Sequence, residues 1–326
     1  MEAQAHILVI TFFFFLVLHW LAKYYYKPKT TLSHKLPPGP KKLPLIGNLH
    51  QLALAGSLPH HALRDLAYKY GPLMHLQLGQ ISSVVVSSPK MAKEIMKTHD
   101  VAFVQRPQFL SAEILTYGQK DIAFAPYGNY WRQMKKICVS ELLSAKRVQS
   151  FSHIREDETA KFIESIRTSA GSPINLTSKI YSLISSSVSR AACGNKYKEQ
   201  DEFVSSIQKL IAAGGGFELD DLFPSMKLNF ITGRKAKLEK LFMQVDKILE
   251  NIVKEHQEKR VRAPEGTIQI EEEDLVDVLL RIQQSDTLEI KITTTSIKAM
   301  ILHSCIHTSN GWENYCCRSD NKDPIY

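Results

Sequence analysis

Trp131 and Lys135 are the two residues of this chain whose types and spacing best suit the binding of an anion. Pro126 and Gly128 form a turn before them, and the absence of helix-breaking residues afterwards predicts a helix from about Tyr130. Residues four apart share one face of a helix, so an indole N–H and an ammonium can hold an anionic group together, with flat apolar bulk beside it. The alternative is a half-buried tryptophan next to a solvated lysine.

Cysteine and histidine are the other residue types here with chemical potential. The five cysteines are an odd number without framework spacing, which fits a reducing compartment; they are Cys138, Cys193, Cys305, Cys316 and Cys317. His303, Cys305 and His307 alternate in the last part of the chain, but this spacing matches no common zinc module. We therefore predict no metal site, and no Ser-His-Asp or paired-carboxylate pattern stands out elsewhere.

Composition favours a folded protein that meets a membrane. A chain of 326 residues with 44% hydrophobic residues can bury one large core or two smaller ones. The net charge of +8 is spread along the sequence without a nucleic-acid recognition module, so no nucleic-acid partner is predicted.

The first 29 residues predict a transmembrane signal anchor. The stretch from Ile7 to Tyr26 is almost wholly apolar and would span roughly 30 Å as a helix, the thickness of a bilayer core. Glu2 is the only charged residue before this stretch, whereas Lys23 lies near its end and five further lysines follow it within the first 42 residues. This asymmetry predicts a single-pass anchor with the body of the protein in the cytosol.

Residues 30–50 are rich in proline and predict a semi-rigid hinge. A helix is expected over Pro59–Tyr70, followed by a hairpin of Leu73–Leu78 and Ile81–Ser87 around Gly79-Gln80. Ser88 is expected to cap the next helix.

Helices dominate the rest of the chain. Apolar residues recur at helical spacing over Lys235–Val253, Asp274–Ile282 predicts another helix, and Thr293–Thr295 could cap a third. The charged stretch Lys254–Glu273 between them is interpreted as a solvated loop, and Gly214-Gly-Gly216 as a flexible junction between helices.

Three motifs resemble the plant microsomal cytochrome P450 monooxygenases, most of all their terpenoid-oxidising branch. They are Phe124-Ala-Pro-Tyr-Gly-Asn-Tyr-Trp-Arg-Gln-Met-Lys-Lys136, Leu36-Pro-Pro-Gly-Pro40 with Leu43-Pro-Leu-Ile-Gly-Asn-Leu-His50, and Phe103-Val-Gln-Arg-Pro107. The resemblance implies a mainly α fold with a small β-sheet, as the N-terminal portion of the P450 fold behind one transmembrane helix. It also implies that Trp131 and Lys135 hold the haem propionates. Lys135 stands where the family has arginine and lacks its two-pronged hydrogen-bonding geometry.

The resemblance further implies haem-dependent hydroxylation of a small hydrophobic substrate such as a terpenoid, with electrons from NADPH through NADPH-cytochrome P450 reductase. The endoplasmic reticulum membrane and its lipid are the expected location and partner. The apolar stretch Arg106–Phe124 corresponds to the family's substrate loop, with Phe109, Ile114, Leu115 and Phe124 as candidates, although it could equally be a buried connector.

The resemblance ends at about Leu302. The acid-alcohol pair of the family's central helix and the region with the haem-ligating cysteine are not found after it, so the axial cysteine is expected to be absent. The expected organisation is an anchor (1–29), a hinge (30–50), an incomplete P450-like helical domain (51–302) and a divergent, unstructured tail (303–326). Whether the chain is an enzyme is therefore left open at this stage. On these grounds the chain is expected to be inactive as given, and the alternative is a non-catalytic membrane-anchored helical remnant.

Overall fold

A computed structural model gives the structure of the chain. It describes residues 6, 11–20, 36–54, 58–194, 200–215, 219–226, 233–262, 273–285 and 288–316, without the side chains of residue 200 and of 307–316. Its helices are α2 (Leu49–Leu54), α3 (Pro59–Tyr70), α4 (Pro89–Lys93), α5 (Asp100–Phe103), α6 (Leu110–Leu115), α7 (Asn129–Ile137), α8 (Ala145–Ser150), α9 (Ser152–Arg167), α10 (Leu176–Cys193), α11 (Gln200–Gly214), α12 (Leu219–Leu222), α14 (Arg234–Arg262), α15 (Leu275–Gln284) and α16 (Thr294–Cys316), with π-helical turns η1 (Glu94–Thr98) and η2 (Cys138–Leu142).

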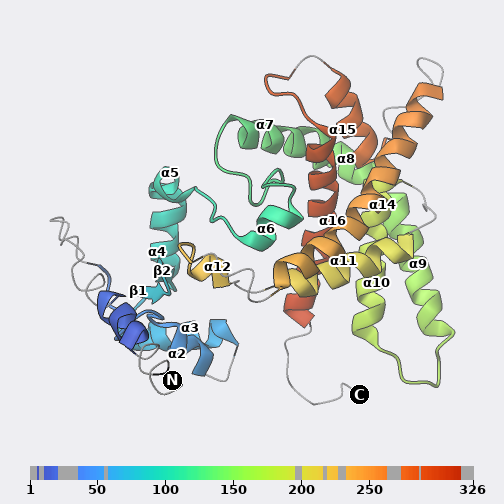
Figure 1. Cartoon of the computed structure of the whole chain (residues 1–326). Coiled ribbons are helices and arrows are strands. Elements are labelled where there is room, and N and C mark those ends of the chain that lie inside the picture. Colours follow the sequence, from blue (N-terminus) through green and yellow to red (C-terminus); the bar gives the residue numbers. More distant parts are fainter. Residues whose placement is uncertain are drawn as a thin grey trace.

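The small sheet is one antiparallel hairpin, as the sequence predicts. Strands β1 (Leu73–Leu78) and β2 (Ile81–Val86) pair from Leu73 opposite Val86 to Leu78 opposite Ile81. Ser88 then caps α4 by accepting a hydrogen bond from the amide of Met91, which confirms the predicted cap. Helix α12, distant in sequence, lies beside this hairpin (Figure 1), because the amide of Gln80 donates to the oxygen of Leu222.

The core lies among the helices of the larger part of the molecule, where α10 packs on α16 and α11 packs on α14 (Figure 1). The apolar stripe of α14 supplies buried side chains at Leu238, Val245, Ile248, Leu249, Ile252 and Val253, as its helical spacing predicts. Asp274 caps α15 by accepting from the amide of Asp277, and Thr293 caps α16 through the amide of Ser296. The expected mainly helical fold with a small sheet is therefore confirmed.

Two expected boundaries are wrong. Helix α14 continues through the charged residues to Arg262, because its last turns place the charges outward and bury His256. Helix α16 likewise extends to Cys316, into the stretch from 303 onward for which an unstructured tail was expected. Residues 317–326 lie outside the described part.

The predicted membrane anchor falls mostly on residues that the structure does not describe. Residues 11–20 are helical, and the seven apolar side chains from Phe12 to Leu18 are all exposed. Among the helices that can be described, none is both long and apolar enough to cross a bilayer.

Candidate functional site

Trp131 and Lys135 lie together on α7, as their spacing predicts. The helix begins after Gly128, and the Lys135 Nζ lies 4.9 Å from the centre of the indole ring, within cation–π range. Lys135 is exposed and Trp131 is half-buried. The pair therefore presents one positive charge fixed over a flat apolar surface, although the haem contact itself stays a prediction.

The indole donor is directed elsewhere. Trp131 Nε1 donates to the main-chain oxygen of Ile122 at 2.9 Å, and the neighbouring Tyr130 hydroxyl donates to the oxygen of Lys120 at 2.7 Å. Both aromatic residues of α7 thus hold the segment that precedes the helix. Of the predicted pair, Lys135 has the group available to an anion, and Trp131 supports it by stacking.

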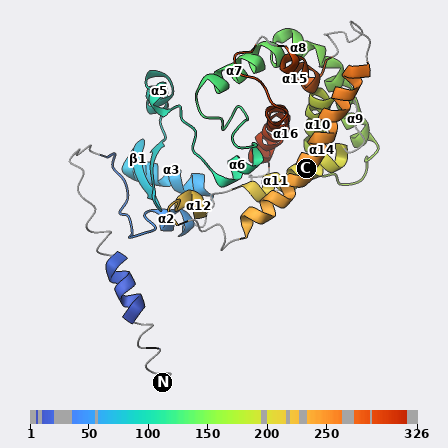
Figure 2. The ribbon, with the colours of Figure 1, turned by 45° about the horizontal axis from the view of Figure 1, so that its top comes forward.

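The segment from Thr116 to Phe124 runs beside α16 (Figure 2). Asp121, with only 2% of its surface exposed, accepts from the amide of Phe124 at 2.9 Å and pairs with His303 Nδ1 of α16 at 3.0 Å. This pair links the segment to α16. His303 belongs to the stretch for which the sequence predicted only a divergent tail.

Two of the four predicted substrate-loop residues pack against the helical core. Ile114 and Leu115 belong to α6 and pack against the helical core, where Leu115 fits against Gly214 at the end of α11; a Cβ at that glycine would lie 2.9 Å from Leu115 Cδ1. Phe109 precedes α6 and Phe124 ends the segment, and both are half-buried. Core packing thus accounts for Ile114 and Leu115, as the buried-connector interpretation expects, while their contact with a substrate stays a prediction.

An apolar cavity of about 460 Å³ lies between the segment and helices α8, α9, α10, α15 and α16. Ile122 of the segment lines it together with Met300 and His303 of α16. Its volume falls in the range of small-molecule sites. Sequence reasoning did not single out Ile122, since one isoleucine in an apolar loop gives no signal of its own.

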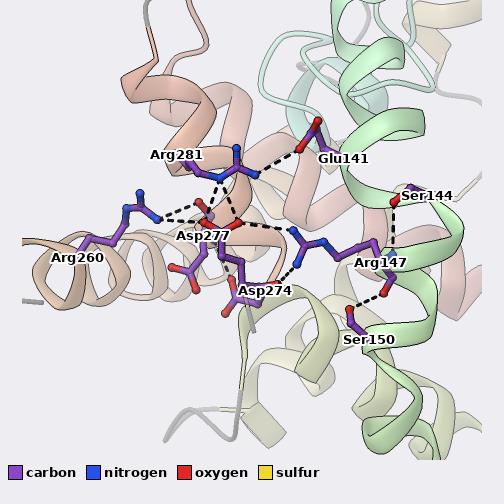
Figure 3. A network of polar contacts seen from close by, with 9 residues as sticks. Glu141, Ser144, Arg147, Ser150, Arg260, Asp274, Asp277 and Arg281 are labelled. Atoms are coloured by element: carbon purple, nitrogen blue, oxygen red, sulfur yellow. Dashed lines mark hydrogen bonds and ion pairs between the residues drawn. The ribbon is translucent and has the colours of Figure 1, made fainter. Parts of the chain in front are cut away.

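A buried carboxylate next to this cavity joins four elements (Figure 3). Glu273 is 2% exposed, and both of its side-chain oxygens lie 3.1 Å from Arg281 Nε, while its main-chain oxygen accepts from Arg147 Nη1 at 2.9 Å. Arg281 also reaches Glu141 at 3.3 Å, and Arg260 lies 3.9 Å from Glu273. The charges compensate each other, so the network stabilises the junction of η2, α8, α14 and α15.

His256, Asp274 and Asp277 are the residues of the described part grouped closely enough to suit a metal ion, with ligand atoms within 4.8 Å of one another. However, His256 Nε2 pairs with Asp274 at 2.8 Å, and its Nδ1 contacts the oxygen of Ile252 at 2.8 Å. Burial opposes the charged imidazole, but the hydrogen bond and charge of Asp274 outweigh it and raise the pKa of His256. The group is a satisfied ion pair that closes α14 onto α15.

The three cysteines whose side chains are described do not suit a thiolate ligand. Cys138, Cys193 and Cys305 are buried thiols. Burial raises the pKa of Cys138 to about 11 and that of Cys305 to about 12, and it raises the pKa of Cys193 well above its ordinary value. These thiols are therefore neutral at physiological pH.

Comparison with known proteins gives the same family for most of the chain. The family model of cytochrome P450 matches residues 37–306. The chain is 61% identical over 303 residues to cytochrome P450 71D8 of Glycine max, covering 92% of this chain and 60% of that protein. It is 49% identical to premnaspirodiene oxygenase of Hyoscyamus muticus and 48% identical to 5-epiaristolochene 1,3-dihydroxylase of Nicotiana tabacum, covering 90% of this chain and 58% of each relative. The chain thus spans about three fifths of the length of these relatives.

The fold also resembles solved structures. A zebrafish cytochrome P450 structure with progesterone superposes with a TM-score of 0.61 at 23% sequence identity, covering 76% of this chain and 56% of that one. At this level of identity the likeness concerns the fold alone.

Proposed function

The chain belongs to the cytochrome P450 family, and from this premise we propose that it is part of a haem-dependent monooxygenase that hydroxylates a small terpenoid-like substrate. The observation that carries the proposal is the family match over residues 37–306, within which Lys135 is fixed over Trp131 on α7. Two of the relatives are named as oxygenases of terpenoids, which favours this substrate class. Nothing in the described residues favours a non-catalytic remnant over this proposal.

Haem, when bound, supplies the oxidising chemistry of the family. The described residues of α7 offer a haem propionate one positive charge, without the two parallel hydrogen bonds of an arginine. The exposed ammonium of Lys135 can pair with a carboxylate as a point charge, and the indole of Trp131 holds that ammonium in place. We propose that Lys135 holds a propionate and that Trp131 acts through Lys135, without donating its own hydrogen bond.

We also propose that the protein sits on the endoplasmic reticulum membrane with its body in the cytosol and takes electrons from NADPH-cytochrome P450 reductase. Support comes from the apolar stretch near the N-terminus, of which Phe12–Leu18 is exposed, and from the lysines that follow it. Both the reductase and the membrane are partners expected from the family.

The test uses the full chain of 326 residues in microsomes that contain the reductase, with haem precursor, NADPH and premnaspirodiene as the probe substrate. The expected result is haem that copurifies with the protein and a hydroxylated product that requires NADPH. Microsomes without the chain are the control. Absence of both haem and product, with the chain present at normal levels, would overturn the proposal.

A further inference from the structure

A second cluster of contacts, separate from those of Trp131, holds the start of the segment between α6 and α7. The Tyr117 hydroxyl donates to Asp246 Oδ1 of α14 at 2.7 Å. Lys298 of α16 donates to the same oxygen at 2.5 Å and lies 3.0 Å from Glu250 Oε2. Its Nζ also lies 5.2 Å from the centre of the Tyr117 ring. One tyrosine therefore joins the segment to two long helices.

The protonation states of this cluster support the contacts. Burial, the hydrogen bond to Asp246 and the charges of Asp246 and Glu250 all raise the pKa of Tyr117, so the phenol stays a donor. Burial disfavours the Lys298 ammonium, but its hydrogen bonds with Asp246 and Glu250 outweigh this and raise its pKa. The Lys298 side chain is only 11% exposed, so its positive charge has little contact with water.

Tyr117 has a backbone conformation that a bulky residue adopts only when its surroundings impose it. Tyr117, Gly118 and Gln119 have φ values of 55°, 73° and 61°, three successive residues in the left-handed region. This region is unfavourable for a side chain with a Cβ, and it persists where packing and hydrogen bonds over-determine it. The Phe242 ring, 4.8 Å from the Tyr117 ring in an edge-to-face arrangement, adds such packing.

The same segment forms part of the cavity wall farther along. Asp121 pairs with His303, and Ile122 both accepts from Trp131 and lines the cavity. The segment thus passes along α16 from Lys298 at one end to His303 at the other.

We propose that Tyr117 is a positioning residue, whose hydroxyl bond to Asp246 and stacking under Lys298 fix the segment 116–124 and so set the position of Ile122 in the cavity wall. The consequence for substrate selection rests on the proposed function. The positioning itself rests on the contacts alone. Tyr117 touches no reacting group in this proposal.

The test compares hydrogen exchange of the full chain with that of Tyr117→Phe, which keeps the ring and removes only the hydroxyl. Gly118 and Lys120 amides donate to Glu113 and Thr116 oxygens at 2.8 Å, so their exchange reports opening of the segment. We expect peptides covering 116–124 to exchange roughly tenfold faster, because a hydrogen bond to a carboxylate is lost. Peptides of α10 should be unchanged. The matched control is Tyr68→Phe, at a tyrosine that is 84% exposed.

A second pair of variants protects the result against simple misfolding. Lys298→Arg keeps the charge and should leave exchange of the segment near that of the unaltered chain, whereas Lys298→Met should accelerate it. Tyr117→Phe combined with Asp246→Ala should accelerate exchange of the segment by less than the two single variants added together, since each of them removes the Tyr117–Asp246 hydrogen bond. Unchanged exchange in Tyr117→Phe, or equal acceleration through the whole chain, would overturn the proposal.

The substrate arm separates this inference from the proposed function. The affinity of the haem-loaded chain for premnaspirodiene can be measured from the shift of the haem spectrum. This affinity should fall several-fold in Tyr117→Phe and stay unchanged in Tyr68→Phe. Failure of the unaltered chain to bind the probe would count against the proposed function. The exchange result would still decide whether Tyr117 positions the segment.

Discussion

The indole Nε1 of Trp131 donates a hydrogen bond to the main-chain oxygen of Ile122 across 2.9 Å. The bond joins the first turns of α7 to the segment that lines the cavity, and it uses the donor that sequence reasoning assigned to an anion. It also leaves the indole face free to support Lys135, whose Nζ lies 4.9 Å from the ring centre. Trp131 therefore positions the Ile122 segment and the Lys135 ammonium, and Lys135 supplies the positive charge of the site.

Replacing Trp131 by Phe should destabilise the protein modestly. The variant keeps an aromatic ring near Lys135 but leaves the oxygen of Ile122 without its donor, at a cost of about 1 kcal/mol in the free energy of unfolding. Urea denaturation of the full chain measures the difference. An unchanged denaturation midpoint would show that water replaces the indole at no cost.

Haem retention should follow the charge and geometry at position 135. Lys135 is exposed, so its pairing with a propionate is worth little, and Lys135→Glu should weaken haem binding by a factor of about two to five. Lys135→Arg should strengthen it by a similar factor, because a guanidinium can make two parallel hydrogen bonds. The measurement is haem bound per mole of purified protein.

Lys136 offers the matched control for this series, since it is the next residue, equally charged and exposed, but borders a different, polar groove toward α15. Lys136→Glu should leave haem retention as it is. Equal losses in Lys135→Glu and Lys136→Glu would mean that general charge on α7, and not this face, attracts the cofactor.

Local patterns predicted much of this fold. The hairpin, the caps at Ser88 and Thr293 and the stripe of α14 depend on neighbours within a few residues, and the structure contains them all. The extension of α14 could not be predicted in this way, because its buried His256 pairs with Asp274, a residue 18 positions later in the chain. The same holds for the candidate site, since neither the Trp131–Ile122 hydrogen bond nor the left-handed conformations of Tyr117 and Gln119 follow from a local sequence pattern.

The His256–Asp274 ion pair should make stability depend on pH above neutrality. Because Asp274 raises the pKa of His256 in the folded state, the pair stabilises the protein fully below the ordinary histidine pKa of 6.5. This stability is lost as the pH rises through the raised pKa of the folded state. Unfolding free energies measured from pH 6 upward should therefore fall.

Asp274→Asn tests this assignment without removing the helix cap, because asparagine also accepts from the amide of Asp277. The fall in stability above pH 6.5 should flatten in this variant. Burial, and then the charge of Asp274, also raise the pKa of the neighbouring Asp277 carboxyl. A variant with the same slope as the unaltered chain would contradict the assignment.

The proposed cytosolic orientation predicts that Asn175 carries no glycan. Asn175-Leu176-Thr177 is an acceptor triplet, and its exposed asparagine caps α10 by accepting from the amide of Ser178 at 2.9 Å. Thr177→Ala removes the acceptor signal and leaves this cap intact. Microsomal protein should migrate identically with and without glycosidase, in both forms; a glycosidase-sensitive shift lost in Thr177→Ala would invert the orientation.

The buried thiols of the described part should not ligate haem iron. Cys138 lies one turn beyond Lys135, where η2 follows α7, and Cys193 and Cys305 lie in the core between α10 and α16; all three are buried and have raised pKa values. A thiolate ligand needs a low pKa and neighbouring donors. With haem bound to the full chain, then reduced and exposed to carbon monoxide, Cys138→Ser, Cys193→Ser and Cys305→Ser should each leave the Soret spectrum unchanged. In the same preparations, iodoacetamide at pH 8 should leave these three thiols unmodified until the protein is unfolded, which checks their burial independently of haem. A red-shifted ferrous carbon monoxide band that disappears in any one of the three variants would identify that cysteine as the ligand and refute the assignment of all three as neutral core thiols.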